Sequence, residues 1–363
     1  MIDILENAVR IKSPSGDERE VATYLARAMK VFGFDRAFVD DAENAIGVIG
    51  DGPKQLVFLG HIDTVEGDVP VRYEDDAGGR KLYGRGTVDA KGPLCAFILA
   101  ARNYIGKLSD WQIVIVGASG EESAYAKGAR FALTQYAPKM CIIGEPSSSG
   151  AVTLGYKGRL LAEVHMEQAS QHTARPGPNP SEYAVKLWNS IHTVAELYNG
   201  LKQDAFDLLM PKLRDIQAGD DGLREWCDMR MGFRLPPEVT PQQLQQRILS
   251  EFESVKQNST LDKIASTINF RGNEPAVRAD RNTPLVYAFL DAIRAEKLRP
   301  SLKLKTGTSD WNVVAPYWKC PTLAYGPGDS NLDHTPIEHV YVHEFERAVR
   351  VLTRVVGAIV SSN

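Results

Sequence analysis

The stretch IVIVGASGEES, residues 113–123, joins an uninterrupted apolar run to two adjacent glutamates. Four consecutive Ile and Val residues predict a strand buried on both faces, as in a parallel sheet. Similar runs lie at residues 45–49, 56–59 and 140–143, and helical patterns lie at 18–32, 92–104 and 126–136. This alternation favours an α/β fold whose mostly parallel sheet carries helices on both faces. We therefore expect catalytic residues at the strand ends.

The composition is that of an ordinary globular chain. The 363 residues carry a formal net charge of -4 and are 43% hydrophobic, which gives no reason to expect a nucleic-acid or anionic-membrane partner. Asp3 and Glu6 precede any basic residue, so we expect no secretory signal, and the apolar run at 94–101 is too short to cross a membrane. The four cysteines form no C-x-x-C pair, which predicts buried thiols and a cytoplasmic protein.

The sequence pattern changes near residue 157. From there the order strand, helix, strand, helix, strand, with room for one more strand, predicts a smaller α+β module inserted into the first domain. We expect the catalytic domain to comprise residues 1–155 and 272–363, and the inserted lid and dimerisation domain to comprise residues 156–271.

Five imidazole and carboxylate side chains each follow a predicted strand of the larger domain: His61, Asp89, Glu122, Glu145 and His334. Taken singly, each has an ordinary explanation as a surface histidine, a helix cap or a turn residue. Strand ends converge in such a fold, so five such groups there favour a metal or catalytic site. Asp63 lies two residues after His61 and points the same way on an extended chain, where it could orient the imidazole.

Six segments, in order, resemble the signature of the M20 family of dinuclear metallohydrolases, which includes aminoacylases, carboxypeptidases and desuccinylases. These segments are GHIDTV (60–65), GRGTVDAKG (84–92), SGEES (119–123), IGEP (143–146), HTARP (172–176) and YGPGDSNLDHTP (325–336). The resemblance covers nearly the whole chain and implies a fold of the zinc-aminopeptidase type. The length, the inserted module and GDSNLDHTPIEH are most similar to the branch that frees lysine or ornithine from an acyl or amino-carrier-protein conjugate in lysine and arginine biosynthesis.

The resemblance implies two divalent metal ions. His61, Asp89 and Glu145 would hold one ion, and Asp89, Glu122 and His334 would hold the other, so that Asp89 bridges them. A shell of carboxylates and imidazoles without a thiolate suits zinc best, with cobalt or manganese as substitutes. The family often has a cis peptide after the bridging aspartate, for which the candidate here is Asp89-Ala90.

The same resemblance assigns roles in catalysis and substrate binding. Glu121 would be the general base. On an extended chain adjacent side chains point in opposite directions, so Glu122 could hold an ion while Glu121 faces the water. His172 would stabilise the tetrahedral oxyanion, in the family often from the partner subunit. Arg234 would bind the substrate carboxylate, with Arg230 on the same strand face as the alternative. The pocket loop would contain Thr308 and Ser309.

The leading prediction is a homodimeric dizinc amide hydrolase that acts on an N-acetyl-amino acid or an amino-carrier-protein conjugate. Alternatives within the family are a deacetylase of N-acetylornithine or N-acetylcitrulline, a succinyl-diaminopimelate desuccinylase, and a dipeptidase or carboxypeptidase. A different class is a non-catalytic metal-binding protein that has kept the fold. The presence of Glu121 beside a complete set of candidate ligands disfavours that class.

Overall fold

The computed structural model describes residues 1–123, 125–172, 174, 177–257 and 264–361. The chain forms two compact units. Unit 1 comprises Met1–Gly155, Arg278–Leu304 and Ser309–Asn363, and unit 2 comprises Tyr156–Val277 and Lys305–Thr308. Unit 2 therefore runs past the expected boundary at residue 271, because its last strand continues to Glu274.

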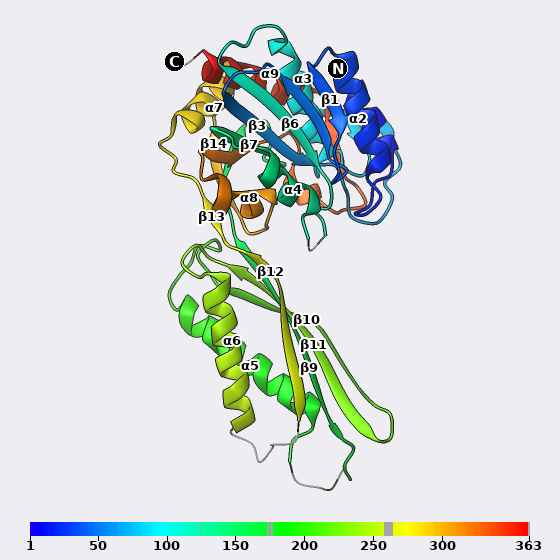
Figure 1. Ribbon diagram of the computed structural model, residues 1–363, viewed down its shortest axis with the longest axis vertical. Helices are drawn as coiled ribbons and strands as arrows, with labels where there is room; N and C mark the ends of the chain where they lie inside the picture. The colour runs from blue at the N-terminus through cyan, green and yellow to red at the C-terminus, as the bar shows by residue number, and fades with distance from the viewer. Residues whose placement is uncertain (124, 173, 175–176, 258–263, 362–363) are drawn as a thin grey trace. The chain divides into compact units, whose positions relative to one another are not determined.

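Unit 1 is built on a nine-stranded sheet, shown in Figure 1. In spatial order its strands are β1 (Arg36–Val39), β2 (Ala45–Ile49), β6 (Trp111–Ala118), β3 (Lys54–His61), β7 (Met140–Gly144), β15 (Thr322–Ala324), β8 (Ala151–Tyr156) and β13 (Val277–Arg278), and β14 (Ser301–Lys305) pairs with β8. The four central strands from β6 to β15 are parallel, as expected. Towards the edges, β1, β2 and β8 pair antiparallel to their neighbours, which the simple alternation of apolar runs did not indicate.

Helices cover both faces of this sheet. They are α1 (Asp3–Arg10), α2 (Arg19–Val31), α3 (Lys91–Ala101), α4 (Lys127–Gln135), α7 (Pro284–Ala295), α8 (Asp310–Trp318) and α9 (Val342–Val360), with short 3-10 turns at Arg102–Tyr104 and Ser330–Leu332. One apolar core joins α1, α2, α3, α7 and α9 to one face of the sheet. On the other face α4 contacts β6 and α8 contacts β3. Every residue of α3 is buried, which explains why its sequence is apolar after Lys91 at its start.

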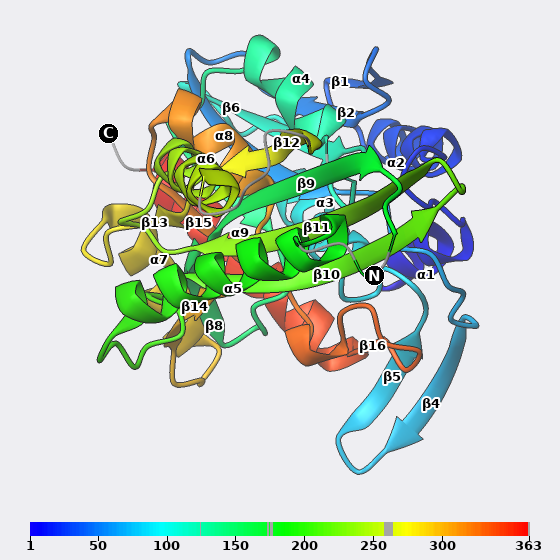
Figure 2. The ribbon, with the colours of Figure 1, turned by 90° about the horizontal axis from the view of Figure 1, so that it is seen from below.

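A small second sheet in unit 1 has the order β16-β5-β4. Its strands are β4 (Arg72–Asp76), β5 (Gly79–Tyr83) and β16 (His339–Tyr341). Figure 2 shows β4 and β5 as a projecting hairpin with β16 beside β5. Because β5 leads directly into the loop before Asp89, and β16 follows soon after His334, this sheet brings two distant candidate segments together.

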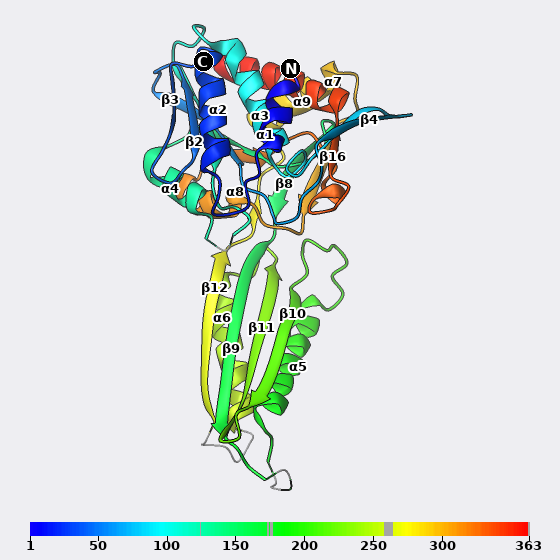
Figure 3. The same ribbon diagram turned by 90° about the vertical axis from the view of Figure 1, so that its right-hand side faces the viewer.

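Unit 2 is a four-stranded antiparallel sheet in the order β10-β11-β9-β12. Its strands are β9 (Gly158–Ala169), β10 (Met210–Asp220), β11 (Arg224–Leu235) and β12 (Ala265–Glu274), and its helices are α5 (Pro180–Asn199) and α6 (Pro241–Gln257). Both helices lie on one face of the sheet (Figure 3). The core between them uses alternate strand residues, such as Val164, Met166, Met229 and Met231.

Among the helices of the described residues, none is both long and apolar enough to cross a membrane.

Candidate metal centre

Three neighbouring parallel strands end at the same edge of the large sheet. His61 is the last residue of β3 and pairs in register with Ala118, the last residue of β6. Gly60 pairs with Gly144 at the end of β7. Glu121 and Glu122 follow β6 closely, and Glu145 follows β7 directly. The parallel arrangement therefore gathers candidate side chains from three separate segments at one edge, as the sequence pattern predicted.

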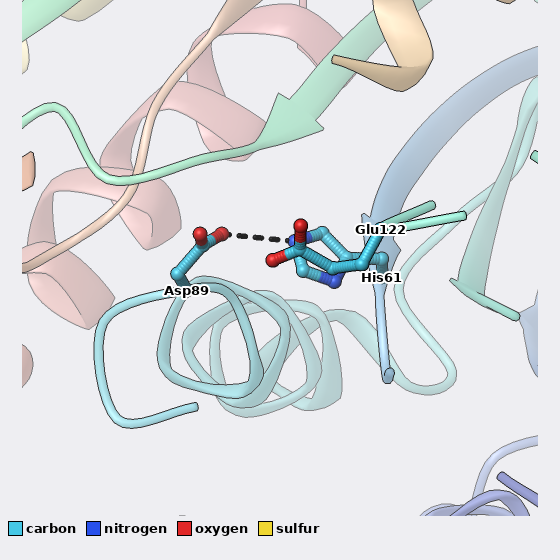
Figure 4. A group of neighbouring side chains, drawn as sticks. All are labelled: His61, Asp89 and Glu122. Atoms are coloured by element: carbon cyan, nitrogen blue, oxygen red, sulfur yellow. Dashed lines mark hydrogen bonds and ion pairs between the residues drawn. The ribbon is translucent and has the colours of Figure 1, made fainter. Parts of the chain in front are cut away.

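Asp89 lies between two histidines. Its Oδ1 is 3.0 Å from His61 Nε2, and its Oδ2 is 3.1 Å from His334 Nε2. Figure 4 shows the Asp89 carboxylate facing the His61 ring, with Glu122 beside that ring. The peptide bond from Asp89 to Ala90 is cis. One carboxylate thus offers a separate oxygen to each imidazole, which is the arrangement that a bridging ligand needs.

His334 is shared between two carboxylates. Its Nε2 lies 2.8 Å from Glu122 Oε1, in addition to its contact with Asp89. The structure also brings together three possible ligand atoms, one from each of His61, Asp89 and Glu122. They all lie within 4.8 Å of one another, close enough to bind a single metal ion. Oxygen and imidazole donors converge here without a thiolate, so the residues fit a divalent ion such as zinc.

The electrostatics of the site favour added positive charge. The hydrogen bonds from His334 to Asp89 and Glu122 raise the pKa of His334 to about 10. Burial opposes ionisation of Asp89, but its hydrogen bonds with His334 and His61 outweigh burial and hold its pKa well below the ordinary range. Both shifts have the same cause, the close approach of carboxylates and imidazoles, and the surplus of carboxylate charge favours a cation at this position.

Asp63 anchors the glutamate doublet through backbone atoms. The N–H of Glu121 donates to Asp63 Oδ1 and the N–H of Glu122 donates to Oδ2, each over 3.0 Å. Ser15 Oγ donates to the same carboxylate over 2.6 Å. His61 Nδ1 is 2.9 Å from the backbone oxygen of Asp63 and 3.5 Å from its carboxylate. The backbone oxygen is therefore the closer contact for the imidazole, and the carboxylate chiefly holds the turn after β6.

Glu121 has the electrostatic surroundings of a proton acceptor. Burial raises its pKa well above the ordinary range, His61 opposes this, and the negative charges of Asp310, Glu145 and Glu122 add to it. A carboxylate with a raised pKa holds a transferred proton more readily than an ordinary glutamate does. Glu145 itself is buried, with 8% of its surface exposed.

The remaining predicted residues lie in unit 2 or at its boundary. His172 follows β9, and its Nδ1 accepts the N–H of Ala174. Arg234 Nη1 donates to Thr308 Oγ1 over 2.9 Å, so the structure pairs two of the predicted substrate-binding residues. Ser309 Oγ accepts the N–H of Trp311 and caps α8. The alternative Arg230 is paired with Asp215 at 2.8 Å.

Sequence reasoning missed two residues that support this centre. Ser15 contacts Asp63 from the loop between α1 and α2. Glu338 is fully buried and accepts hydrogen bonds from the loop that carries Asp89. The one available signal for Glu338 was its position four residues after His334, and nothing comparable marked Ser15.

Most of the chain matches one protein family and several known proteins. Residues 57–358 match peptidase family M20/M25/M40. A [LysW]-lysine hydrolase of Deinococcus radiodurans is 42% identical over 362 residues, covering 99% of this chain and 96% of that protein. A putative [LysW]-lysine/[LysW]-ornithine hydrolase of Thermococcus kodakarensis is 35% identical, covering 98% of this chain and 91% of that one.

Two solved structures show the same fold at low sequence identity. The M20 family metallo-carboxypeptidase Sso-CP2 from Sulfolobus solfataricus superposes with a TM-score of 0.76 at 16% identity, covering 98% of each chain. The YXEP protein of Bacillus subtilis, a dinuclear metal binding peptidase from the M20 family, superposes with a TM-score of 0.72 at 12% identity, covering 100% of this chain and 98% of that one.

Proposed function

This chain belongs to peptidase family M20/M25/M40, and from that premise we propose that it hydrolyses an amide bond to release lysine or ornithine from an amino-carrier protein. The single observation that carries the hydrolytic part is the position of Asp89 between His61 and His334. The carrier conjugate is proposed because the Deinococcus radiodurans relative, similar over nearly its full length, is named for that substrate.

The donor set fits two divalent ions, and we propose that both are zinc, with cobalt or manganese as substitutes. His61, Asp89 and Glu145 would hold one ion, and Asp89, Glu122 and His334 would hold the other. Bound ions would polarise the amide carbonyl and lower the pKa of bound water. The buried carboxylate of Asp63 would keep the Glu121–Glu122 turn in place while the ions bind.

Glu121 would act as the general base. It would take a proton from the attacking water and deliver it to the leaving amine nitrogen, so that the product leaves as an amine. His172 would donate a hydrogen bond to the oxyanion of the tetrahedral intermediate, from its own subunit or from the partner.

Arg234 would bind the α-carboxylate of the amino acid. The hydrogen bond from Arg234 Nη1 to Thr308 Oγ1 ties the guanidinium to the predicted pocket loop. A fixed guanidinium recognises a carboxylate well because its nitrogens form a planar fork. Ser309 adjoins Thr308, and its hydroxyl, used as the cap of α8, would support the shape of the loop.

We also propose that the protein is a cytoplasmic homodimer joined through unit 2. β10 is an edge strand of its sheet, and exposed apolar side chains lie on β10 and at the end of α5: Met210, Ile216, Leu197 and Leu201. An exposed strand edge with apolar neighbours is commonly covered by a second copy. Sedimentation should give a dimer for the wild type and a monomer for Ile216→Asp, and a monomeric wild type would contradict the proposal.

The substrate is tested by a panel assayed with zinc and with cobalt. The panel contains lysine and ornithine conjugates of an amino-carrier protein, N-acetyl-lysine, N-acetylornithine, succinyl-diaminopimelate and simple dipeptides. We expect kcat/KM for a carrier conjugate to exceed that for every other substrate by at least about a hundredfold. Equal or faster hydrolysis of an N-acetyl amino acid or a dipeptide would refute the carrier assignment and leave the metal-dependent hydrolase.

A further inference from the structure

Glu338 is fully buried beside the loop that leads to Asp89. Its Oε1 accepts the N–H groups of Gly86 and Val88 over 2.9 Å each, and that of Asp89 over 3.2 Å. Its Oε2 accepts a hydrogen bond from Arg85 Nη1 over 2.8 Å. Three of these donors are backbone groups of the Asp89 loop, and all three converge on a single carboxylate oxygen.

Local backbone geometry allows this convergence. Gly86 has a φ of +89°, which side-chain-bearing residues rarely adopt, and a Cβ there would lie 3.1 Å from atoms of Lys91 and Thr64. The glycine therefore lets the loop curl so that several of its N–H groups point at one oxygen. This arrangement resembles an anion-binding nest, occupied here by the protein's own carboxylate.

Arg85 extends the same connection to the His334 loop. Its Nη1 also donates to the backbone oxygen of Thr335 over 3.2 Å, and its Nε donates to the backbone oxygen of Gly67 over 3.0 Å. Thr335 adjoins His334, and Gly67 lies in the loop that follows Asp63. The Arg85–Glu338 pair is thus bonded to three loops, each of which follows or carries a residue of the candidate centre.

Strand pairing places Glu338 where it can make these bonds. His339 at the start of β16 pairs with Tyr83 at the end of β5, and the N–H of Gly84 donates to the backbone oxygen of Glu338 over 3.3 Å. The small sheet therefore sets the register between the Asp89 loop and the segment after His334. The hydrogen bonds of the Glu338 side chain then hold the Asp89 loop against the segment after His334.

We infer that Glu338 is a positioning residue that sets the placement of Asp89 relative to His334, and so the affinity of the site that these two residues share. The inference rests on the proposed two-ion function. Groups that hold metal ligands in place commonly change metal affinity by about 10- to 100-fold when they are removed. Glu338 acts on the ligands through backbone N–H groups, so its side chain need not touch an ion.

The test is a zinc titration of purified Glu338→Gln against a chromophoric chelator. Glutamine keeps the volume of the side chain and one acceptor oxygen. Its NH2 group, however, would face N–H donors of the Asp89 loop or of Arg85, and loss of the negative charge would weaken the bond to Arg85. We expect the second zinc ion to bind about 10- to 100-fold more weakly than in the wild type. We also expect a changed visible spectrum of the cobalt-substituted protein, which reports ligand geometry and which a general loss of stability would not alter.

Glu296→Gln is the matched control. Glu296 is also largely buried, with its side chain 10% exposed, and it pairs with Arg350 at 2.8 Å and with Arg354 at 3.6 Å. Its loss should leave zinc affinity and the cobalt spectrum as in the wild type. Wild-type zinc affinity and an unchanged spectrum in Glu338→Gln would overturn the inference. Failure of the wild type itself to bind a second zinc ion would instead refute the two-ion function.

A second variant keeps the test decisive if Glu338→Gln does not fold. Arg85→Lys keeps a positive charge near Glu338, but a single ammonium cannot reproduce the planar fork that contacts Glu338, Thr335 and Gly67. We expect weaker binding of the second zinc ion in this variant as well. Wild-type zinc affinity in Arg85→Lys would overturn the inference.

Discussion

His334 Nε2 lies 3.1 Å from Asp89 Oδ2, although Asp89 belongs to the first segment of unit 1 and His334 to its last. The other oxygen of Asp89 faces His61. The two histidines therefore meet different atoms of one side chain, and any change that moves Asp89 alters both contacts at once. The carboxylate of Asp89 is therefore shared by the two halves of the candidate metal centre.

Glu121→Gln should abolish most turnover while metal binding stays normal. The amide keeps the size of the side chain but cannot take a proton at neutral pH. We expect kcat to fall by about 10²- to 10⁴-fold, the usual contribution of a general base. Metal analysis should give the same zinc content as the wild type. Turnover near the wild-type rate would rule out this role for Glu121.

Glu122→Gln should lower metal binding, which Glu121→Gln should leave unchanged. Glu122 Oε1 is the 2.8 Å partner of His334, so loss of its charge would weaken a proposed metal ligand and remove the charged partner of that imidazole. We expect zinc occupancy to fall below that of Glu121→Gln when both are dialysed against the same buffer and measured by atomic absorption. Equal occupancy in the two variants would show that Glu122 is not a ligand.

Asp63→Asn should loosen the turn that carries both glutamates. The asparagine amide has one acceptor oxygen, so its NH2 group would face one of the two N–H donors. We expect a loss of about 1–3 kcal/mol in the free energy of unfolding, from one unsatisfied buried donor. Denaturant unfolding measures this loss. Ser15→Ala is the milder control, because it leaves both backbone bonds intact, and an equal loss in the two variants would contradict the explanation.

Removal of metal by a chelator should lower stability as well as activity. Ions that bind the folded protein stabilise it by mass action, by about 4 kcal/mol at a free concentration a thousand times the dissociation constant. We therefore expect a lower midpoint of thermal unfolding after chelation and its recovery on addition of zinc or cobalt. A midpoint that chelation leaves unchanged would contradict a metal centre at His61, Asp89 and Glu122.

Lys157 should give the stability of unit 2 a characteristic pH dependence. Its buried ammonium donates to the backbone oxygens of Ala205, Phe206 and Leu208. Burial outweighs the attraction of Asp207 and Asp204 and lowers the pKa of Lys157 from 10.5 to about 8.

Between these two values the folded protein binds fewer protons at Lys157 than the unfolded chain, so this site contributes more stability as pH rises from about 8 to 10.5. Below pH 8 both states are charged and the contribution is constant. The free energy of unfolding of the wild type relative to Lys157→Met should therefore increase across that window in denaturant titrations. A constant difference would contradict the lowered pKa.

The sequence predicted those parts of the site that follow from local runs of apolar residues. Buried apolar runs indicated β3, β6 and β7, and because parallel strands end at one edge, it followed that His61 and Glu122 would lie together. The same pattern placed Asp89 and His334 after predicted strands, and the family resemblance assigned both to one ion, but neither indicated which strand pairing brings His334 to Asp89. Their approach depends on β16 pairing with β5, and both are short strands with polar, partly exposed residues and no apolar run.

Glu338 illustrates the same limit for supporting residues. A glutamate in the segment TPIEHV looks like a solvated loop residue, yet it is fully buried in the structure. Its burial is made possible by Arg85 and by N–H groups that a glycine-containing loop turns inward. Neither partner is near in sequence, so no spacing rule could have identified the contact. The structure was needed to reveal it.

Glu121 and Glu122 are attached to the Asp63 carboxylate through their main-chain N–H groups, and their side chains take no part in these two bonds. The anchor is therefore indifferent to which amino acids stand at positions 121 and 122, provided neither is proline. The two side chains could therefore be substituted while the turn that carries them keeps its backbone conformation. The same strand end could present different reactive groups, and substitutions at positions 121 and 122 should report side-chain chemistry with little contribution from a displaced backbone.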